Sequence, residues 1–111
     1  MKKIIVFVGF AILGLLIQQT AKAGGDAAAG KEKAALCATC HGADGNSPSP
    51  EFPILAGQYA DYIVAALQQY QDGRRTNAIM MPFAINLTKQ DMEDLAAYFA
   101  SQEGPLQVLQ K

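Results

Sequence analysis

The sequence predicts an all-α domain with three principal helices and two long loops. Apolar side chains recur every three or four residues in two segments, residues 59–70 and 92–99, as they do on the buried face of a helix. No segment after residue 23 alternates apolar and polar side chains over a useful length, which a half-buried strand would do. Glycine and proline gather between the helical segments, so we expect long irregular connections there.

Residues 1–23 have the pattern of a secretory signal peptide. Two lysines give a positively charged start, an apolar run covers residues 4–17, and Ala-Lys-Ala at 21–23 forms a small-x-small cleavage site. The alternative, an uncleaved membrane anchor, is disfavoured because a spanning helix needs roughly 20 apolar residues. We therefore expect cleavage before Gly24 and a periplasmic domain of residues 24–111 without membrane insertion.

The charge balance becomes acidic once the predicted signal peptide is removed. The full chain has 9 Lys and Arg against 10 Asp and Glu. Residues 1–23 contain three of the basic residues and none of the acidic ones, so the remaining 88 residues carry a formal charge of −4. This chain lacks the basic excess that binding to a phosphate backbone requires, which excludes nucleic acid as a partner. A domain of this size buries a marginal core, and a cofactor often supplies the missing stability.

The first predicted helix covers residues 27–36 and ends at the first cysteine. Asp26 precedes it and belongs to the preferred N-cap residue types. The stretch that follows the cysteine motif, residues 42–58, contains three glycines and three prolines, which is too many turn formers for regular structure. Long loops of this kind in small domains often carry function.

The second predicted helix covers residues 59–70 and is ended by Asp72-Gly73. A second irregular stretch follows it, from residue 74 to residue 86. This stretch contains two adjacent methionines followed by a proline, and we expect it to be a loop.

The last predicted helix has the clearest local signals. Thr88 and Asp91 fit the two positions of a capping box, and Leu87 and Met92 fit the flanking hydrophobic staple. Gly104-Pro105 marks the end of this helical segment.

The segment Cys37-Ala38-Thr39-Cys40-His41 is the attachment signature for a c-type haem. Two thiols one helical turn apart can each form a thioether with a haem vinyl group, and the adjacent histidine then lies beneath the iron. A redox-active dithiol would need a βαβ context, and a zinc site would need about four ligands where the chain has three Cys and His residues. A plain disulfide suits an exported protein but leaves the histidine unexplained.

His41 is the chain's only histidine, so the second axial position of the iron needs another residue. Methionine is the usual alternative in electron-carrying cytochromes c, where it raises the reduction potential. Met92 lies on the apolar face of a predicted helix, where a core role is favoured. Met80 and Met81 remain as candidates, and the spacing of residues alone leaves the two nearly equal.

The sequence resembles the class I c-type cytochromes, most of all the short bacterial periplasmic monohaem kind that also forms each half of the tandem di-haem cytochromes c. The resemblance covers nearly all of residues 24–111. The segments that carry it are Cys37-Ala38-Thr39-Cys40-His41-Gly42, Asp44-Gly45-Asn46-Ser47, Phe52-Pro53-Ile54-Leu55-Ala56-Gly57-Gln58 and Leu87 through Phe99. The resemblance implies a class I cytochrome c fold, in which helices and long loops wrap around one covalently bound haem c.

The same resemblance implies roles for individual residues around the haem. The backbone carbonyl of Pro53 would accept a hydrogen bond from the His41 ring, which fixes the tautomer and the plane of a metal-bound histidine. Gly30 in the first helix would pack against residues 95–98 of the last helix. Three loop residues are placed like family residues that contact the haem propionates: Arg74, Arg75 and Asn77.

The resemblance also favours Met80 over Met81 as the axial ligand. In the short bacterial group, the ligand stands seven residues before the leucine that precedes the last helix, and that leucine is Leu87 here. Pro82 restricts the residue before it to extended backbone angles, which limits how Met81 can turn inward. A Met-Pro pair at the ligand is nevertheless common in small cytochromes c, and this keeps Met81 open.

These features predict a periplasmic one-electron carrier of the respiratory chain, not an enzyme. Its His/Met-ligated iron would cycle between Fe(III) and Fe(II) and pass electrons between redox partner proteins, a donor and an acceptor that the sequence does not identify. We expect a monomer or a weak homodimer. One alternative is a cytochrome c subunit dedicated to a periplasmic dehydrogenase or oxidoreductase complex. Another is a haem enzyme or gas-binding protein, which would need an open iron position.

Overall fold

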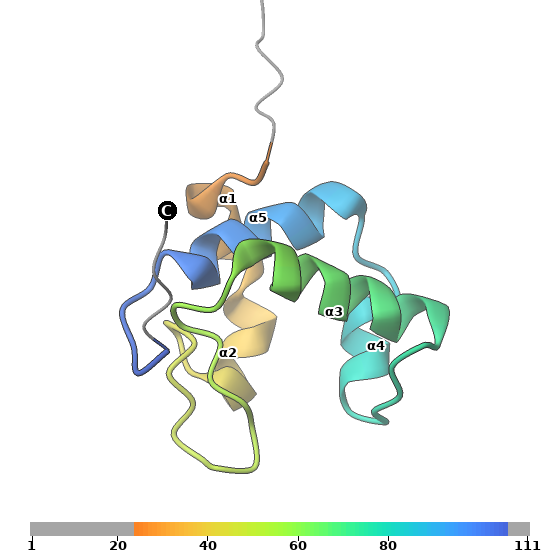
Figure 1. The fold of residues 1–111 in the computed structure, drawn as a ribbon, viewed down its shortest axis with the longest axis horizontal. Coiled ribbons are helices and arrows are strands. Elements are labelled where there is room, and N and C mark those ends of the chain that lie inside the picture. Colours follow the sequence, from red (N-terminus) through yellow and green to blue (C-terminus); the bar gives the residue numbers. More distant parts are fainter. Residues whose placement is uncertain (1–23, 107–111) are drawn as a thin grey trace, which may run out of the picture.

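The computed structural model describes residues 24–106, which contain helices and no strand (Figure 1). The predicted signal peptide and residues 107–111 lie outside the described residues. The all-α prediction is confirmed. None of the described helices is long and apolar enough to cross a membrane. The helices, in chain order, are α1 (Ala27–Lys33), α2 (Ala35–His41), α3 (Ala60–Asp72), α4 (Met80–Ala84) and α5 (Lys89–Ala100).

The helix caps predicted from the sequence are present in the structure. The Asp26 carboxylate accepts a hydrogen bond from the Ala28 N–H at 2.9 Å, at the start of α1. At the start of α5, the Thr88 hydroxyl and the Asp91 carboxylate accept from each other's backbone N–H, which is the predicted capping box. Gly73 ends α3 in the left-handed conformation, with φ +79°.

The first helical segment differs from its prediction. Instead of one helix that ends at the first cysteine, the chain makes a turn at Ala34 and continues helically through His41 as α2. The Ala34 side chain is buried, and its small methyl group allows the chain to turn while it packs against the core. The Cys-x-x-Cys-His motif therefore lies inside a helix.

The second irregular stretch also differs, because it contains the short helix α4. Pro82 is the third residue of α4, where its missing N–H costs no hydrogen bond because N–H groups of the first helical turn have no intrahelical partner. Met81 is helical, so the argument that Pro82 keeps it extended is wrong.

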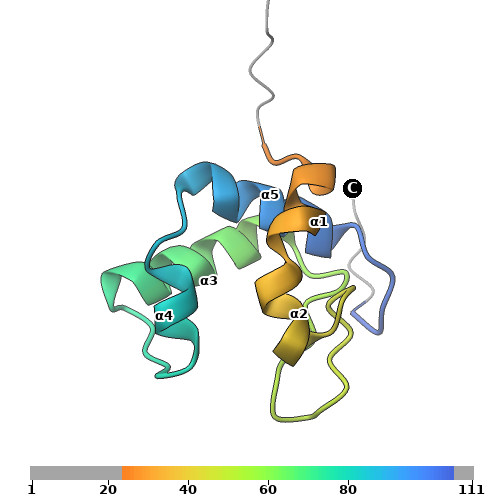
Figure 2. The same ribbon diagram turned by 180° about the vertical axis from the view of Figure 1, so that it is seen from behind.

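Helix α1 crosses α5 at very short distance (Figures 1 and 2). A Cβ atom on Gly30 would lie 1.9 Å from the carbonyl oxygen of Asp94 and 2.8 Å from the Tyr98 Cβ. Glycine is thus required where the two backbones touch. The contact implied by the resemblance is present, and it begins one residue earlier on α5 than we expected.

The core lies between α1, α3 and α5 and is small. Phe99 is the largest side chain that is fully buried among the described residues. Tyr98 is also buried, and its hydroxyl donates a hydrogen bond to the carbonyl of Ala43 at 2.7 Å, which ties the loop after α2 to α5. The buried cluster consists of Ala34, Ile63, Leu95, Ala96, Tyr98 and Phe99.

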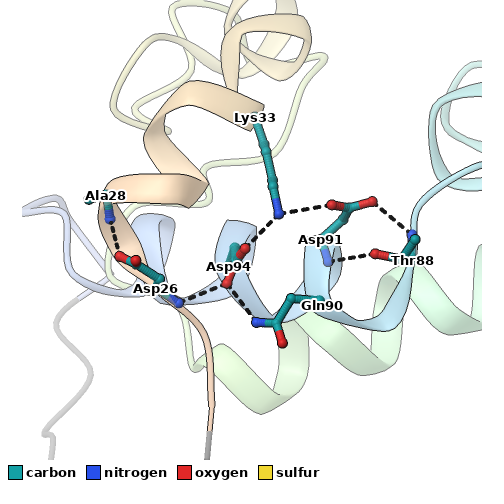
Figure 3. Close-up of polar contacts among 7 residues, drawn as sticks. All are labelled: Asp26, Ala28, Lys33, Thr88, Gln90, Asp91 and Asp94. Carbon is teal, nitrogen blue, oxygen red and sulfur yellow. Dashed lines mark hydrogen bonds and ion pairs between the residues drawn. The ribbon is translucent and has the colours of Figure 1, made fainter. Parts of the chain in front are cut away.

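A buried carboxylate ties the crossing helices together (Figure 3). The Asp94 side chain, 4 % exposed, accepts hydrogen bonds from the Asp26 N–H at 2.8 Å, from Lys33 Nζ at 2.5 Å and from Gln90 Nε2 at 2.8 Å. Lys33 also pairs with Asp91 at 2.8 Å. The hydrogen bond from the Asp26 backbone, followed by that from Lys33, lowers the pKa of Asp94. The Lys33 side chain, followed by the Thr88 backbone N–H, lowers the pKa of Asp91 to about 2.

This cluster predicts that the protein loses stability in acid. A carboxylate whose pKa is lower in the folded than in the unfolded chain stabilises the fold above its unfolded pKa of about 4. That contribution disappears as the pH falls through the folded value, so we expect the free energy of unfolding to drop between about pH 4 and pH 2. Asp94→Asn should cost about 2 kcal/mol at pH 7, because it leaves Lys33 without its buried partner.

Urea denaturation of the holoprotein at a series of pH values checks this expectation. The difference between wild type and Asp94→Asn should shrink as the pH falls below the unfolded pKa of about 4. Glu93→Gln is the control, because Glu93 pairs with the exposed Lys89 at 3.6 Å and should matter little. Equal stability of wild type and Asp94→Asn at pH 7 would contradict the role given to this carboxylate.

Candidate functional site

A pocket of about 260 Å³ lies between α2, the loop after α2, the end of α3 and the α4 region. Helices α2 and α4 extend from the same side of α3 and α5 in both views of the fold (Figures 1 and 2). Seven residues predicted from the sequence line the pocket: Cys37, Cys40, His41, Pro53, Arg75, Asn77 and Met80.

Two half-buried thiols lie on one wall of this pocket. Cys37 and Cys40 are separated by three positions of α2, so their side chains share a helix face. The two cysteines do not form a disulfide with each other in the structure. Burial, and to a smaller extent the neighbouring Cys40, raises the pKa of the Cys37 thiol.

His41 is buried at the end of α2 and is held in one orientation. Its Nδ1 lies 2.8 Å from the carbonyl oxygen of Pro53, and because a carbonyl can only accept, Nδ1–H donates this hydrogen bond. The ring also makes an edge contact with Phe52, at 6.3 Å between ring centroids. The hydrogen bond that the resemblance implied is therefore present. It leaves Nε2 as the ring nitrogen that is able to bind a metal.

The two candidate methionines differ in their place relative to the pocket. Met80, the first residue of α4, lines the pocket together with His41. Met81 is half-buried and is not among the lining residues.

The three residues expected near the haem propionates also differ in whether they line the pocket. Arg75 lines the pocket, and its guanidinium lies 5.2 Å from the centre of the Tyr70 ring and 3.4 Å from the Tyr62 hydroxyl. Asn77 lines the pocket too. Arg74 does not, and its exposed side chain pairs with Asp72 at 2.7 Å. A contact of Arg74 with a haem propionate stays a prediction.

Sequence reasoning missed the apolar residues at the edge of the pocket. Leu36, Ile79 and Phe83 line it, yet 73 %, 55 % and 47 % of their surfaces are exposed. Large apolar side chains gathered around a pocket mouth indicate an apolar ligand. Their signal in the sequence was weak, because each stands near a helix end whose position only the structure gives.

The pocket fits a haem better than a bare metal ion. Within residues 24–106, no group of three or more His, Cys, Asp or Glu side chains is placed to hold a metal ion. The iron of a porphyrin already has most of its ligands, so it needs few from the protein. The apolar edge suits the porphyrin ring, and the two thiols suit its vinyl groups.

The fold and this site define a small haem-binding protein in which a Cys-x-x-Cys-His helix carries the attachment residues. The family model for cytochrome c matches residues 27–103. The chain belongs to the cytochrome c family, and it binds one covalent haem c at Cys37 and Cys40. The family to which the chain belongs consists of haem proteins that transfer electrons.

Several known proteins are similar to this chain in amino-acid sequence. The chain is 52 % identical to cytochrome c4 of Pseudomonas aeruginosa over 92 residues, which cover 83 % of this chain and 46 % of the relative. It is 45 % identical to cytochrome c-554(548) of Halomonas halodenitrificans over 82 residues, which cover 71 % of this chain and 99 % of the relative.

The fold also matches a solved structure. The crystal structure of reduced recombinant cytochrome c4 from Pseudomonas stutzeri aligns with a TM-score of 0.69 and 46 % identity, covering 72 % of this chain and 47 % of that one. The chain spans about half the length of the cytochromes c4 that it matches, and the resemblance stated from the motifs is confirmed.

Proposed function

We propose that this protein is a periplasmic one-electron shuttle whose haem iron is bound axially by His41 and Met80. The observation that carries the proposal is that both side chains line one pocket together with the two attachment cysteines. The bound haem supplies the Fe(III)/Fe(II) couple. The protein supplies the ligands, their orientation and the exclusion of water.

Each of these contributions comes from a contact within the pocket. The Pro53 carbonyl holds the His41 ring in one tautomer and one plane, which also makes the imidazole a stronger electron donor to a metal. Phe52 packs against the same ring and, with Ile79 and Phe83, surrounds the pocket with apolar surface. An apolar surrounding disfavours the more highly charged state of the iron and, like methionine ligation, raises the reduction potential.

Alanine substitutions of the two methionines test the ligand assignment. We expect Met80→Ala to lose the weak near-infrared band of Met-ligated ferric haem, to bind carbon monoxide readily when reduced, and to have a lower reduction potential. Met81→Ala should keep the band and the potential of the wild type, because Met81 does not line the pocket. If Met81→Ala loses the band and Met80→Ala keeps it, the assignment is wrong by one residue.

The proposal places the protein in the periplasm after cleavage of residues 1–23. Its support is the charged start, apolar run and small-x-small site of that segment. The exported protein should have the mass of residues 24–111 plus one haem, as measured by intact-mass spectrometry. Retention of residues 1–23 on the haem-loaded protein would contradict this.

The partners in this proposal are an electron donor and an electron acceptor, both proteins that dock transiently. The acidic charge of −4 on residues 24–111 argues against a lysine-rich docking face on this protein. Such encounters bury little surface, so we expect the binding to be weak.

A further inference from the structure

The start of α4 is held by a single residue that precedes it. The side-chain oxygen of Asn77 accepts hydrogen bonds from the N–H groups of Ile79, at 2.9 Å, and Met80, at 3.0 Å. The backbone carbonyl of Asn77 accepts from the Met81 N–H at 3.0 Å. The first N–H groups of a helix have no partner within the helix. Here Asn77 accepts from the first two of α4, and from the N–H of Ile79 directly before them.

The other end of α4 is held by a side chain from α3. The Gln71 amide nitrogen donates to the carbonyl of Ala84 at 2.7 Å and to the carbonyl of Leu87 at 2.6 Å. An amide NH₂ group has two hydrogens, so both donors are used. Gln71 is half-buried and Ala84 is fully buried, which shields these bonds from competing water.

Helix α4 depends on these bonds because little else fixes it. It has five residues, and a helix of that length is unstable by itself in water. Among the described helices, α4 packs against α3 alone. Its apolar residue Phe83 and the following Ile85 are exposed, so burial contributes only part of its attachment.

We infer that Gln71 and Asn77 are positioning residues that hold α4 at both ends, so that the Met80 side chain stays directed into the pocket. This inference rests on the proposed ligation by Met80. A foreign ligand can bind the iron only in molecules in which Met80 has left it, so its apparent affinity reports how often α4 is displaced. Weakening either end of α4 increases that population.

The test uses ferric holoprotein titrated with imidazole and followed by loss of the near-infrared band. We expect imidazole to bind roughly fivefold more tightly to Asn77→Ala, which loses a helix cap, and roughly tenfold more tightly to Gln71→Ala, which loses two shielded hydrogen bonds. Gln68→Ala is the matched control on the same helix, since no hydrogen bond of its side chain is part of this arrangement. It should bind imidazole like the wild type.

Carboxylate variants separate hydrogen bonding from a simple effect of size. Asn77→Asp keeps an oxygen that accepts from the α4 N–H groups and should stay within about twofold of the wild type. Gln71→Glu has nearly the same shape but cannot donate to two carbonyls, so it should bind imidazole at least as tightly as Gln71→Ala. These two variants retain the side-chain volume. They can be titrated with imidazole even where an alanine variant fails to load haem.

Two results would overturn the inference. One is wild-type imidazole affinity in both alanine variants, and the other is wild-type affinity in Gln71→Glu. The behaviour of Met80→Ala separates this failure from that of the proposed function. If Met80→Ala keeps the near-infrared band, the ligand assignment fails. If it loses the band while the Gln71 and Asn77 variants behave like the wild type, only the positioning role fails.

Discussion

Replacing both Cys37 and Cys40 with alanine is expected to leave a chain that carries no covalent haem and is largely unfolded at room temperature. The described core is small for a domain of this size, because half of its buried apolar residues are alanines. Without haem, the exposed apolar residues around the pocket, such as Leu36 at 73 % exposure, gain no partner. The haem is therefore a large part of the core.

Far-ultraviolet circular dichroism and intact mass check this expectation. The double variant should lose most of its helical signal and all of the haem mass. Thr39→Ala is the matched control, because Thr39 is exposed between the two cysteines on α2 and should leave both signals unchanged. A cooperative helical melting transition in the haem-free double variant would show that the polypeptide folds without its cofactor.

Replacing Gly30 with alanine is expected to destabilise the holoprotein by at least about 3 kcal/mol, at the upper end of the usual cost of overpacking. The new Cβ would meet backbone atoms of α5, which cannot rotate away as a side chain can. The helices must separate, and the hydrogen bonds of Asp94 to the Asp26 backbone and to Lys33 separate with them. The expected fall in melting temperature is more than roughly 10 °C.

Whether Gly30→Ala stabilises or destabilises the protein is what tests the close approach of the two helices. Glycine to alanine inside a helix ordinarily stabilises by about 1 kcal/mol, so a more stable Gly30→Ala would rule out the close approach. Gly73→Ala is the control, because its Cβ would meet no atom within 4 Å and only its left-handed conformation, with φ +79°, opposes the change. Its expected cost is about 1 kcal/mol.

Features that depend on neighbouring residues could be predicted from the sequence. The cap at Asp26, the capping box of Thr88 and Asp91, and the turn at Gly73 each involve hydrogen bonds or backbone angles within a few residues. The haem attachment motif is equally local, since its chemistry needs five consecutive residues. The export signal in residues 1–23 is a pattern of composition along the chain, and it stays a prediction.

Features that depend on distant residues were decided by the tertiary structure alone. The carbonyl of Ala84 at the end of α4 accepts hydrogen bonds from the Leu87 N–H and from the side chain of Gln71, 13 positions earlier, and the local sequence of α4 does not indicate the second of these contacts. The folded chain also decides that Met80 lines the pocket while Met81 does not, and that Arg74 pairs with Asp72 outside the pocket.

The sequence by itself therefore determined the class of fold, the helix caps and the attachment of the haem, because these follow from interactions between neighbours along the chain. The tertiary structure decided which methionine lines the pocket and why Gly30 must lack a side chain. It also decided that Asp94 of α5 binds Lys33 of α1, which lies 61 residues earlier in the chain. Such contacts form between segments whose distance in space is set by the packing of the whole chain, and a local pattern contains no information about that distance.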